Sequence, residues 1–99
     1  MNNAVRALES MGYKILAKAK KTANGPDITV ERKGIILRVE VKKARTMKRS
    51  MAVHPVEPAR THDDLVAVEF PSGYVLIEPM KDYLKSCATS GSRSFFGVY

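Results

Sequence analysis

Two neighbouring segments rich in isoleucine and valine place the strongest constraint on how this chain folds. They are DITVERK, residues 27–33, and IILRVEVKKA, residues 35–44, and they meet at Lys33 and Gly34. Two such runs joined by a short glycine-containing turn predict an antiparallel β-hairpin. The chain is therefore expected to fold around this hairpin.

The turn of the hairpin decides which charged residues face each other. A two-residue turn pairs Arg32 with Ile35 and brings Asp27 opposite Glu40, with about 4.5–5.5 Å between their Cβ atoms. Lys42 then lies one pleat further along, on the same face as Glu40. A three-residue turn would shift this register.

The second strand of the hairpin has one apolar face and one charged face, because successive side chains of a strand point to opposite sides. The core face consists of Ile35, Leu37, Val39 and Val41. The other face carries Ile36, Arg38, Glu40 and Lys42. Two facing carboxylates repel each other unless a positive charge lies between them, and a divalent cation meets that need. The alternative is a solvated face on which Lys42 pairs with either carboxylate.

Short elements are expected on both sides of the hairpin. The sequence predicts a helix over 2–11, a strand over 13–17, a second hairpin from 65–70 and 74–78, and a final helix over 79–85. Segment 45–64 is less regular: its first half is basic, MAVHPV (51–56) has the pattern of a short strand, and two prolines argue against a long helix. Residues 1–99 are expected to form a single α/β domain.

The charge of the chain favours a polyanionic partner. Seventeen Lys and Arg against ten Asp and Glu give a net charge of +7. Nucleic acid is the leading candidate, an anionic membrane surface is the second, and a basic protein-interaction domain without such a partner is the alternative.

Cysteine and hydropathy patterns narrow the setting. Cys87 is the only cysteine, which excludes a disulfide framework and a cysteine-rich zinc site and favours a reducing cytoplasm. No apolar run approaches 18 residues and MNNAVRALES lacks the apolar core of a secretion signal, so neither a membrane span nor export is expected. The apolar end, with Phe95, Phe96 and Tyr99, is expected to dock on its own domain or on a neighbouring subunit.

The hairpin resembles the signature of the PD-(D/E)XK nucleases, which include restriction-endonuclease-like and Holliday-junction-resolvase-like enzymes. Pro26-Asp27 in GPDITV matches the PD element, and Glu40-Val41-Lys42 in VEVKKA matches the (D/E)XK element. The helix that runs into MGYKIL, ending at Gly12 and Tyr13 before the first strand, is similar to the opening of the family. The resemblance covers residues 4–44 well and the later strands more loosely. It implies a restriction-endonuclease-like core, with an N-terminal helix, a mixed sheet around a central hairpin and a flanking helix.

The same resemblance implies a function and a site. The chain would be a metal-dependent DNA endonuclease, and a resolvase-like one if it selects DNA by structure. Asp27, Glu40 and the main-chain carbonyl of Val41 would bind Mg²⁺, with Mn²⁺ able to substitute, because hard oxygens suit these ions. Lys42 would position or activate the attacking water. Many relatives add an acidic residue from the first helix, and Glu9 is the carboxylate available there, at the edge of an apolar stripe where it can face either way.

Further residues are candidates for contacts with DNA. The basic run after the motif carries Lys43, Arg45, Lys48 and Arg49, which are suited to phosphate contacts, and a solvated basic loop is the alternative. Neither His54 nor His62 has a partner at metal-ligand spacing. A homodimer is expected from the small size of the domain and from a two-stranded substrate. The rival function is a non-catalytic nucleic-acid-binding module with a degenerate nuclease fold.

Overall fold

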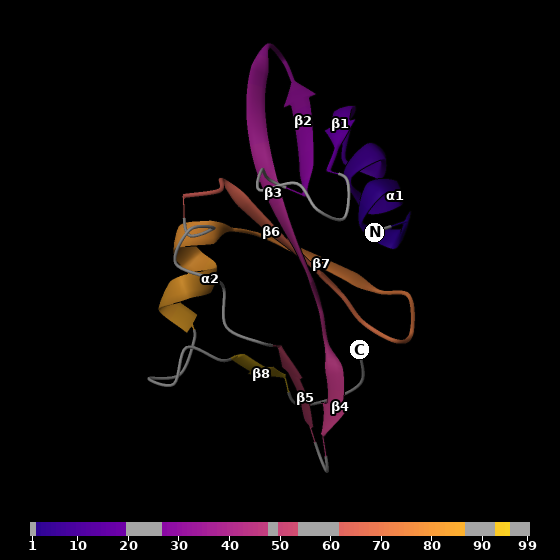
Figure 1. Ribbon diagram of the computed structural model, residues 1–99, viewed down its shortest axis with the longest axis vertical. Coiled ribbons are helices and arrows are strands. Elements are labelled where there is room, and N and C mark those ends of the chain that lie inside the picture. The colour runs from indigo at the N-terminus through magenta and orange to yellow at the C-terminus, as the bar shows by residue number, and fades with distance from the viewer. Residues whose placement is uncertain (1, 20–26, 48–49, 54–61, 87–92, 96–99) are drawn as a thin grey trace.

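The computed structural model describes residues 2–19, 27–47, 50–53, 62–86 and 93–95, and all structural statements below concern these ranges (Figure 1). Their helices and strands, in chain order, are α1 (Asn2–Ser10), β1 (Lys14–Lys18), β2 (Ile28–Arg32), β3 (Ile35–Lys43), β4 (Arg45–Met47), β5 (Ser50–Val53), β6 (Leu65–Glu69), β7 (Val75–Pro79), α2 (Met80–Ser86) and β8 (Arg93–Phe95).

A mixed five-stranded sheet is the centre of the fold. Its strand order is β1-β2-β3-β6-β7, in which β3 and β6 are parallel and the other neighbours are antiparallel. A smaller sheet, β4-β5-β8, lies at the far end of β3 from the hairpin turn (Figure 1). The predicted α/β core, with an N-terminal helix, a mixed sheet built around a hairpin and a flanking helix, is confirmed. Strands β4 and β5 of the small sheet follow directly after β3 in the chain.

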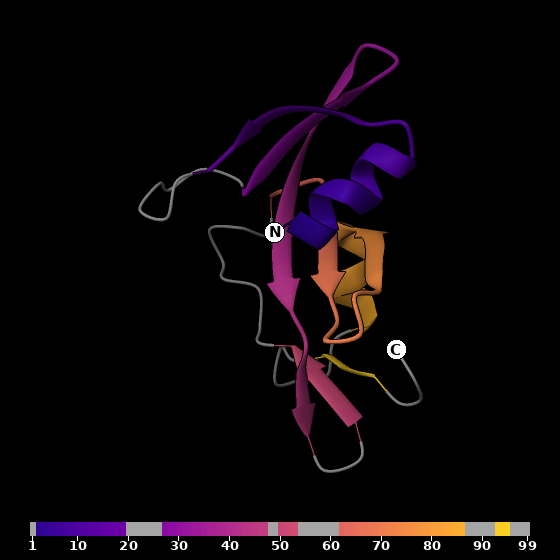
Figure 2. The ribbon, with the colours of Figure 1, turned by 90° about the vertical axis from the view of Figure 1, so that its right-hand side faces the viewer.

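The two helices lie on opposite faces of the large sheet. Alternate residues of β6 show this, since Ala67 packs in the cluster with α1 whereas Val66 and Val68 pack in the cluster with α2. Figure 2 shows α1 in front of the strands and α2 behind them. Leu8 anchors α1 and Tyr83 anchors α2, and both side chains are almost completely buried. The sheet is therefore covered on both faces at its centre.

The predicted two-residue turn is confirmed. Arg32 pairs with Ile35, and the pairing continues to Ile28 opposite Val39. Lys33 and Gly34 have φ angles of 53° and 81°, the left-handed values that a type I′ turn requires at both central positions. This turn is the reason that the register follows from the sequence.

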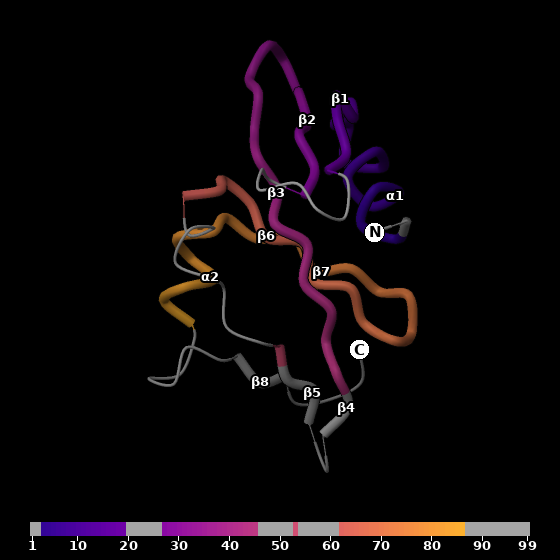
Figure 3. The backbone as a smooth tube through the Cα atoms, viewed as in Figure 1, coloured from indigo at the N-terminus to yellow at the C-terminus, as the bar shows by residue number. Residues whose placement is uncertain are grey.

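Strand β3 changes neighbours at Val39. From Ile35 to Val39 it pairs with β2, and from Val39 to Lys43 it pairs with β6 (Figure 3). Near the turn, Ile35 and Ile36 are 62% and 61% exposed, so the expected core face of this strand begins only at Leu37. The described pairing between β2 and β3 ends at Ile28 and Val39. Beyond Val39, the edge of β3 that faces β2 has no strand partner among the described residues.

Candidate functional site

Asp27 lies directly before β2, beside the part of β3 that β2 no longer pairs with. Its Oδ2 accepts a hydrogen bond of 2.8 Å from the main-chain N–H of Val41. Its own carbonyl accepts a bond of 2.8 Å from the N–H of Ala19, directly after β1. The carboxylate of Asp27 is thus fixed beside the segment Glu40–Lys42 by its bond to β3, and its main chain is held by the residue that follows β1.

Glu40 occupies the next position in the hairpin register, directly after the pair Ile28 and Val39. Continuing this register places Asp27 opposite Glu40, as expected. Glu40 is only 7% exposed, so the interpretation of this residue as a solvated surface charge is wrong. Burial of a carboxylate is costly unless hydrogen bonds or positive charges compensate it. The buried position of Glu40 therefore points to specific partners for its carboxylate.

The main chain of Val41 points toward Asp27. In a strand, the N–H and C=O of one residue project to the same edge, and the N–H of Val41 bonds to Asp27. The carbonyl of Val41 is therefore directed to the same edge. The residue that would face Val41 in a continued hairpin is Pro26, which lies outside the described residues and has no amide proton to offer a carbonyl.

Lys42 follows on the same face as Glu40 and is partly buried. Its neighbour across the parallel pair is Val68, which belongs to the buried cluster under α2. The structure thus bonds the Asp27 carboxylate to the main chain of Val41 and places Glu40 and Lys42, the residues on either side of Val41, on one face of β3.

We call the face of β1, β2 and β3 that lies opposite α1 the open face. The buried cluster under α2 takes its described side chains from β5, β6, α2 and the residues directly after β3 and β6, and none from β1, β2 or β3. Within the described ranges, this face presents Lys14, Thr29, Glu31, Ile36, Arg38, Glu40 and Lys42. Glu40 and Lys42 of the candidate site therefore lie on the same face as Arg38.

Glu9 is not brought to this site. It lies exposed in the last turn of α1, and α1 covers the face of the sheet opposite Glu40 and Lys42. The start of this helix, rather than its end, lies near the end of β6, because Glu69 accepts a bond from the Ala4 N–H. Glu9 is five residues further along, about 7.5 Å on the helix axis.

The predicted basic run is only partly described. Lys43 is exposed and shares the α1 face with Val39 and Val41, so it points away from Lys42. Arg45 is exposed in β4. Lys48, Arg49, His54, Cys87, Phe96 and Tyr99 lie outside the described residues, and Phe95 is described only through its strand pairing with Met51.

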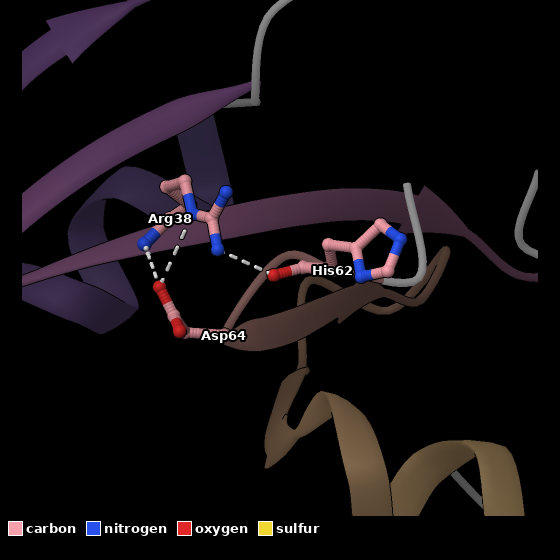
Figure 4. A network of polar contacts seen from close by, with 3 residues as sticks. All are labelled: Arg38, His62 and Asp64. Carbon is pink, nitrogen blue, oxygen red and sulfur yellow. Dashed lines mark hydrogen bonds and ion pairs between the residues drawn. The ribbon is translucent and has the colours of Figure 1, made fainter. Parts of the chain in front are cut away.

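A polar network was missed in the sequence. The Oδ2 atom of Asp64 accepts the Arg38 main-chain N–H at 2.8 Å and lies 3.5 Å from its Nε, and Nη2 donates to the His62 carbonyl at 2.6 Å (Figure 4). The only signal in the sequence was the charge of Arg38 within an apolar strand. Its partners lie more than 20 residues away, and the parallel pairing of β3 with β6 brings them together.

The donor set fits a hard divalent cation. The described residues hold no group of three or more His, Cys, Asp or Glu side chains arranged for a metal. Two carboxylates and one carbonyl nevertheless suit Mg²⁺, which usually keeps several waters and takes only one or two protein carboxylates. The Val41 N–H that orients Asp27 is the kind of outer contact that fixes a metal-binding carboxylate.

Among the described residues, no helix is both long enough and apolar enough to cross a bilayer.

Comparison with known proteins finds a similar fold in one solved endonuclease. The solved structure of a bacterial homing endonuclease, I-Ssp6803I, matches with a TM-score of 0.76 and 17% sequence identity, over 99% of this chain and 70% of that one. No family model matches the chain, and no curated protein does. The similarity is therefore one of fold.

Proposed function

We propose that this chain is a metal-dependent DNA endonuclease of the PD-(D/E)XK type. The observation that carries the proposal is the bond from the Val41 N–H to Asp27, which holds this carboxylate next to Glu40 in the hairpin register. The fold that the chain shares with a homing endonuclease supports the proposal. The net charge of +7 supports DNA as the partner.

The residues would divide the chemistry between them. Asp27, Glu40 and the Val41 carbonyl would hold Mg²⁺, or Mn²⁺ in its place. Such an ion, when bound, polarises a phosphate oxygen and lowers the pKa of coordinated water. Lys42 lies on the same face as Glu40, where its ammonium group can orient a water and offset charge on the phosphate. The partial burial of Lys42 limits competition from bulk solvent at this point.

Cleavage by the wild-type protein tests the proposal directly. Labelled duplex, nicked, flap and four-way-junction DNA would each be incubated with Mg²⁺, Mn²⁺ or EDTA. We expect cleavage of at least one substrate with either metal and none with EDTA. A protein that binds these DNAs but cuts none of them under either metal would instead be a binding module, and the nuclease proposal would be wrong.

We also propose that the active form is a homodimer, because two sites are needed to cut both strands at once and a domain of this size buries only a modest core. Size-exclusion chromatography with light scattering should give twice the mass of the 11.0 kDa chain at assay concentration. A mass of one chain would contradict the dimer without affecting the proposed chemistry.

A further inference from the structure

Three charged residues stand in a row on the open face of β3. Arg38, Glu40 and Lys42 alternate with core-facing residues, so each is about 6.8 Å from the next along the strand. Glu40 is thus flanked by a cation on each side. Lys42 has a role in the proposed site, whereas Arg38 has none there.

Arg38 is held in place at both its main chain and its guanidinium group. Asp64 accepts the Arg38 N–H at 2.8 Å, and its own N–H donates to the Arg38 carbonyl at 2.8 Å. The guanidinium group donates to the His62 carbonyl at 2.6 Å and pairs with Asp64 at 3.5 Å (Figure 4). These contacts orient the guanidinium group before any ligand arrives, which reduces the entropy lost on binding.

The guanidinium group keeps binding capacity after these contacts. Arginine has five N–H donors, and the contacts to Asp64 and His62 use Nε and one hydrogen of Nη2. The side chain of Arg38 is 48% exposed. Its cross-strand neighbour is Thr29, so no carboxylate stands directly opposite it on β2.

The ion pair alone explains little of this arrangement. Arg38 and Asp64 are both substantially exposed, and exposed pairs contribute only about 0–1 kcal/mol to stability. A planar, oriented guanidinium group with remaining donors is, however, well suited to two oxygens of one phosphate.

We propose that Arg38 binds a backbone phosphate of the DNA strand that enters the candidate site, so that the strand follows the open face of β3 toward the hairpin turn. The position of the scissile phosphate in this proposal rests on the proposed function. The contact between Arg38 and a DNA phosphate does not. Each strand of a DNA duplex carries one phosphate per about 3.4 Å of helix axis, so the spacing of about 6.8 Å between Arg38 and Glu40 along β3 equals about two nucleotides of rise. Arg38 therefore holds a phosphate within about two nucleotides of the one that is cut.

Arg32 provides a matched control. It has the same charge and lies in the same hairpin, but it shares the opposite face with Ile28 and Val30. Its guanidinium carbon lies 5.5 Å from the centre of the Tyr13 ring. A general effect of net charge would act equally on both arginines, whereas a phosphate contact on the open face involves Arg38 alone.

The test measures binding without cleavage. Fluorescence anisotropy with a labelled DNA duplex would be recorded over a series of salt concentrations in EDTA, for the wild type, Arg38→Gln and Arg32→Gln. One lost phosphate contact lowers the slope of log K against log salt by about 0.9. We expect this change for Arg38→Gln together with weaker binding, and the wild-type slope for Arg32→Gln. Equal slopes for all three proteins, or equal losses in the two variants, would overturn the proposal.

Two further variants distinguish a direct phosphate contact by Arg38 from a purely structural role of Arg38 in the fold. Arg38→Lys keeps the charge and should keep the slope. Asp64→Asn removes the ion pair but keeps an acceptor for the Arg38 N–H, and it should also keep the slope. If Asp64→Asn lost as much slope as Arg38→Gln, Arg38 would only support the loop and the proposal would fail. Wild-type protein that shows these slopes but cuts no DNA with Mg²⁺ would refute the proposed nuclease alone.

Discussion

Replacing Glu40 by glutamine or Lys42 by methionine should each lower the rate of metal-dependent cleavage severely while DNA binding largely persists. Glu40→Gln keeps the volume of a side chain that is only 7% exposed but removes the charge proposed to hold the cation. Lys42→Met keeps an apolar stem of similar length in a partly buried position. Positioned acid–base groups typically contribute 10²–10⁴-fold to a rate, so we expect a loss of about that size from Lys42→Met. Single-turnover cleavage with Mg²⁺ measures it.

Lys43→Met is the control for this experiment. Lys43 is the next residue in β3 and is exposed, but it points to the α1 face. The substitution removes the same charge from the same strand, so the chemical step should proceed at nearly the wild-type rate. Cleavage at the wild-type rate in both Glu40→Gln and Lys42→Met would come from a contaminating enzyme and would contradict the assignment of the site.

Local signals in the sequence were sufficient to predict the hairpin and its register. Lys33 and Gly34 adopt the left-handed conformations that the turn needs, and the turn then determines every pair up to Ile28 and Val39. Alternation of side chains along β3 gave the two faces. These inferences depend on neighbours in sequence, and physical rules of turn geometry and pleat are strong at that range.

Contacts between distant segments could not be predicted in the same way. The parallel pairing of β3 with β6 brings Asp64 to Arg38, and no local pattern specifies which strands become neighbours. The helical wheel could not place Glu9 either, because the face of the sheet that α1 covers is decided by tertiary packing. The pairing of β8 with β5 is a third such case. It joins the last described strand to a segment for which the sequence indicated only a short strand next to prolines.

Nothing in the sequence indicated that Glu69 supports the start of α1, and its replacement should destabilise the fold. It is the last residue of β6, its side chain lies on the α1 face, and it is 7% exposed. Its Oε2 accepts a hydrogen bond of 3.0 Å from the buried main-chain N–H of Ala4. The first turn of α1 contains no acidic residue of its own. A carboxylate from the sheet therefore satisfies a donor at the start of the helix and meets the positive end of the helix dipole.

Glu69→Ala should lower the free energy of unfolding by about 1–3 kcal/mol, because it leaves the buried N–H of Ala4 without this acceptor. Glu69→Gln keeps an acceptor and loses only the charge, which is worth about 0.3–1 kcal/mol at a helix terminus. Urea denaturation followed by circular dichroism measures both. Glu9→Gln, which removes an exposed carboxylate from the last turn of the same helix, should not destabilise the protein. Wild-type stability in Glu69→Ala would show that the start of α1 is held by its apolar contacts with the sheet alone.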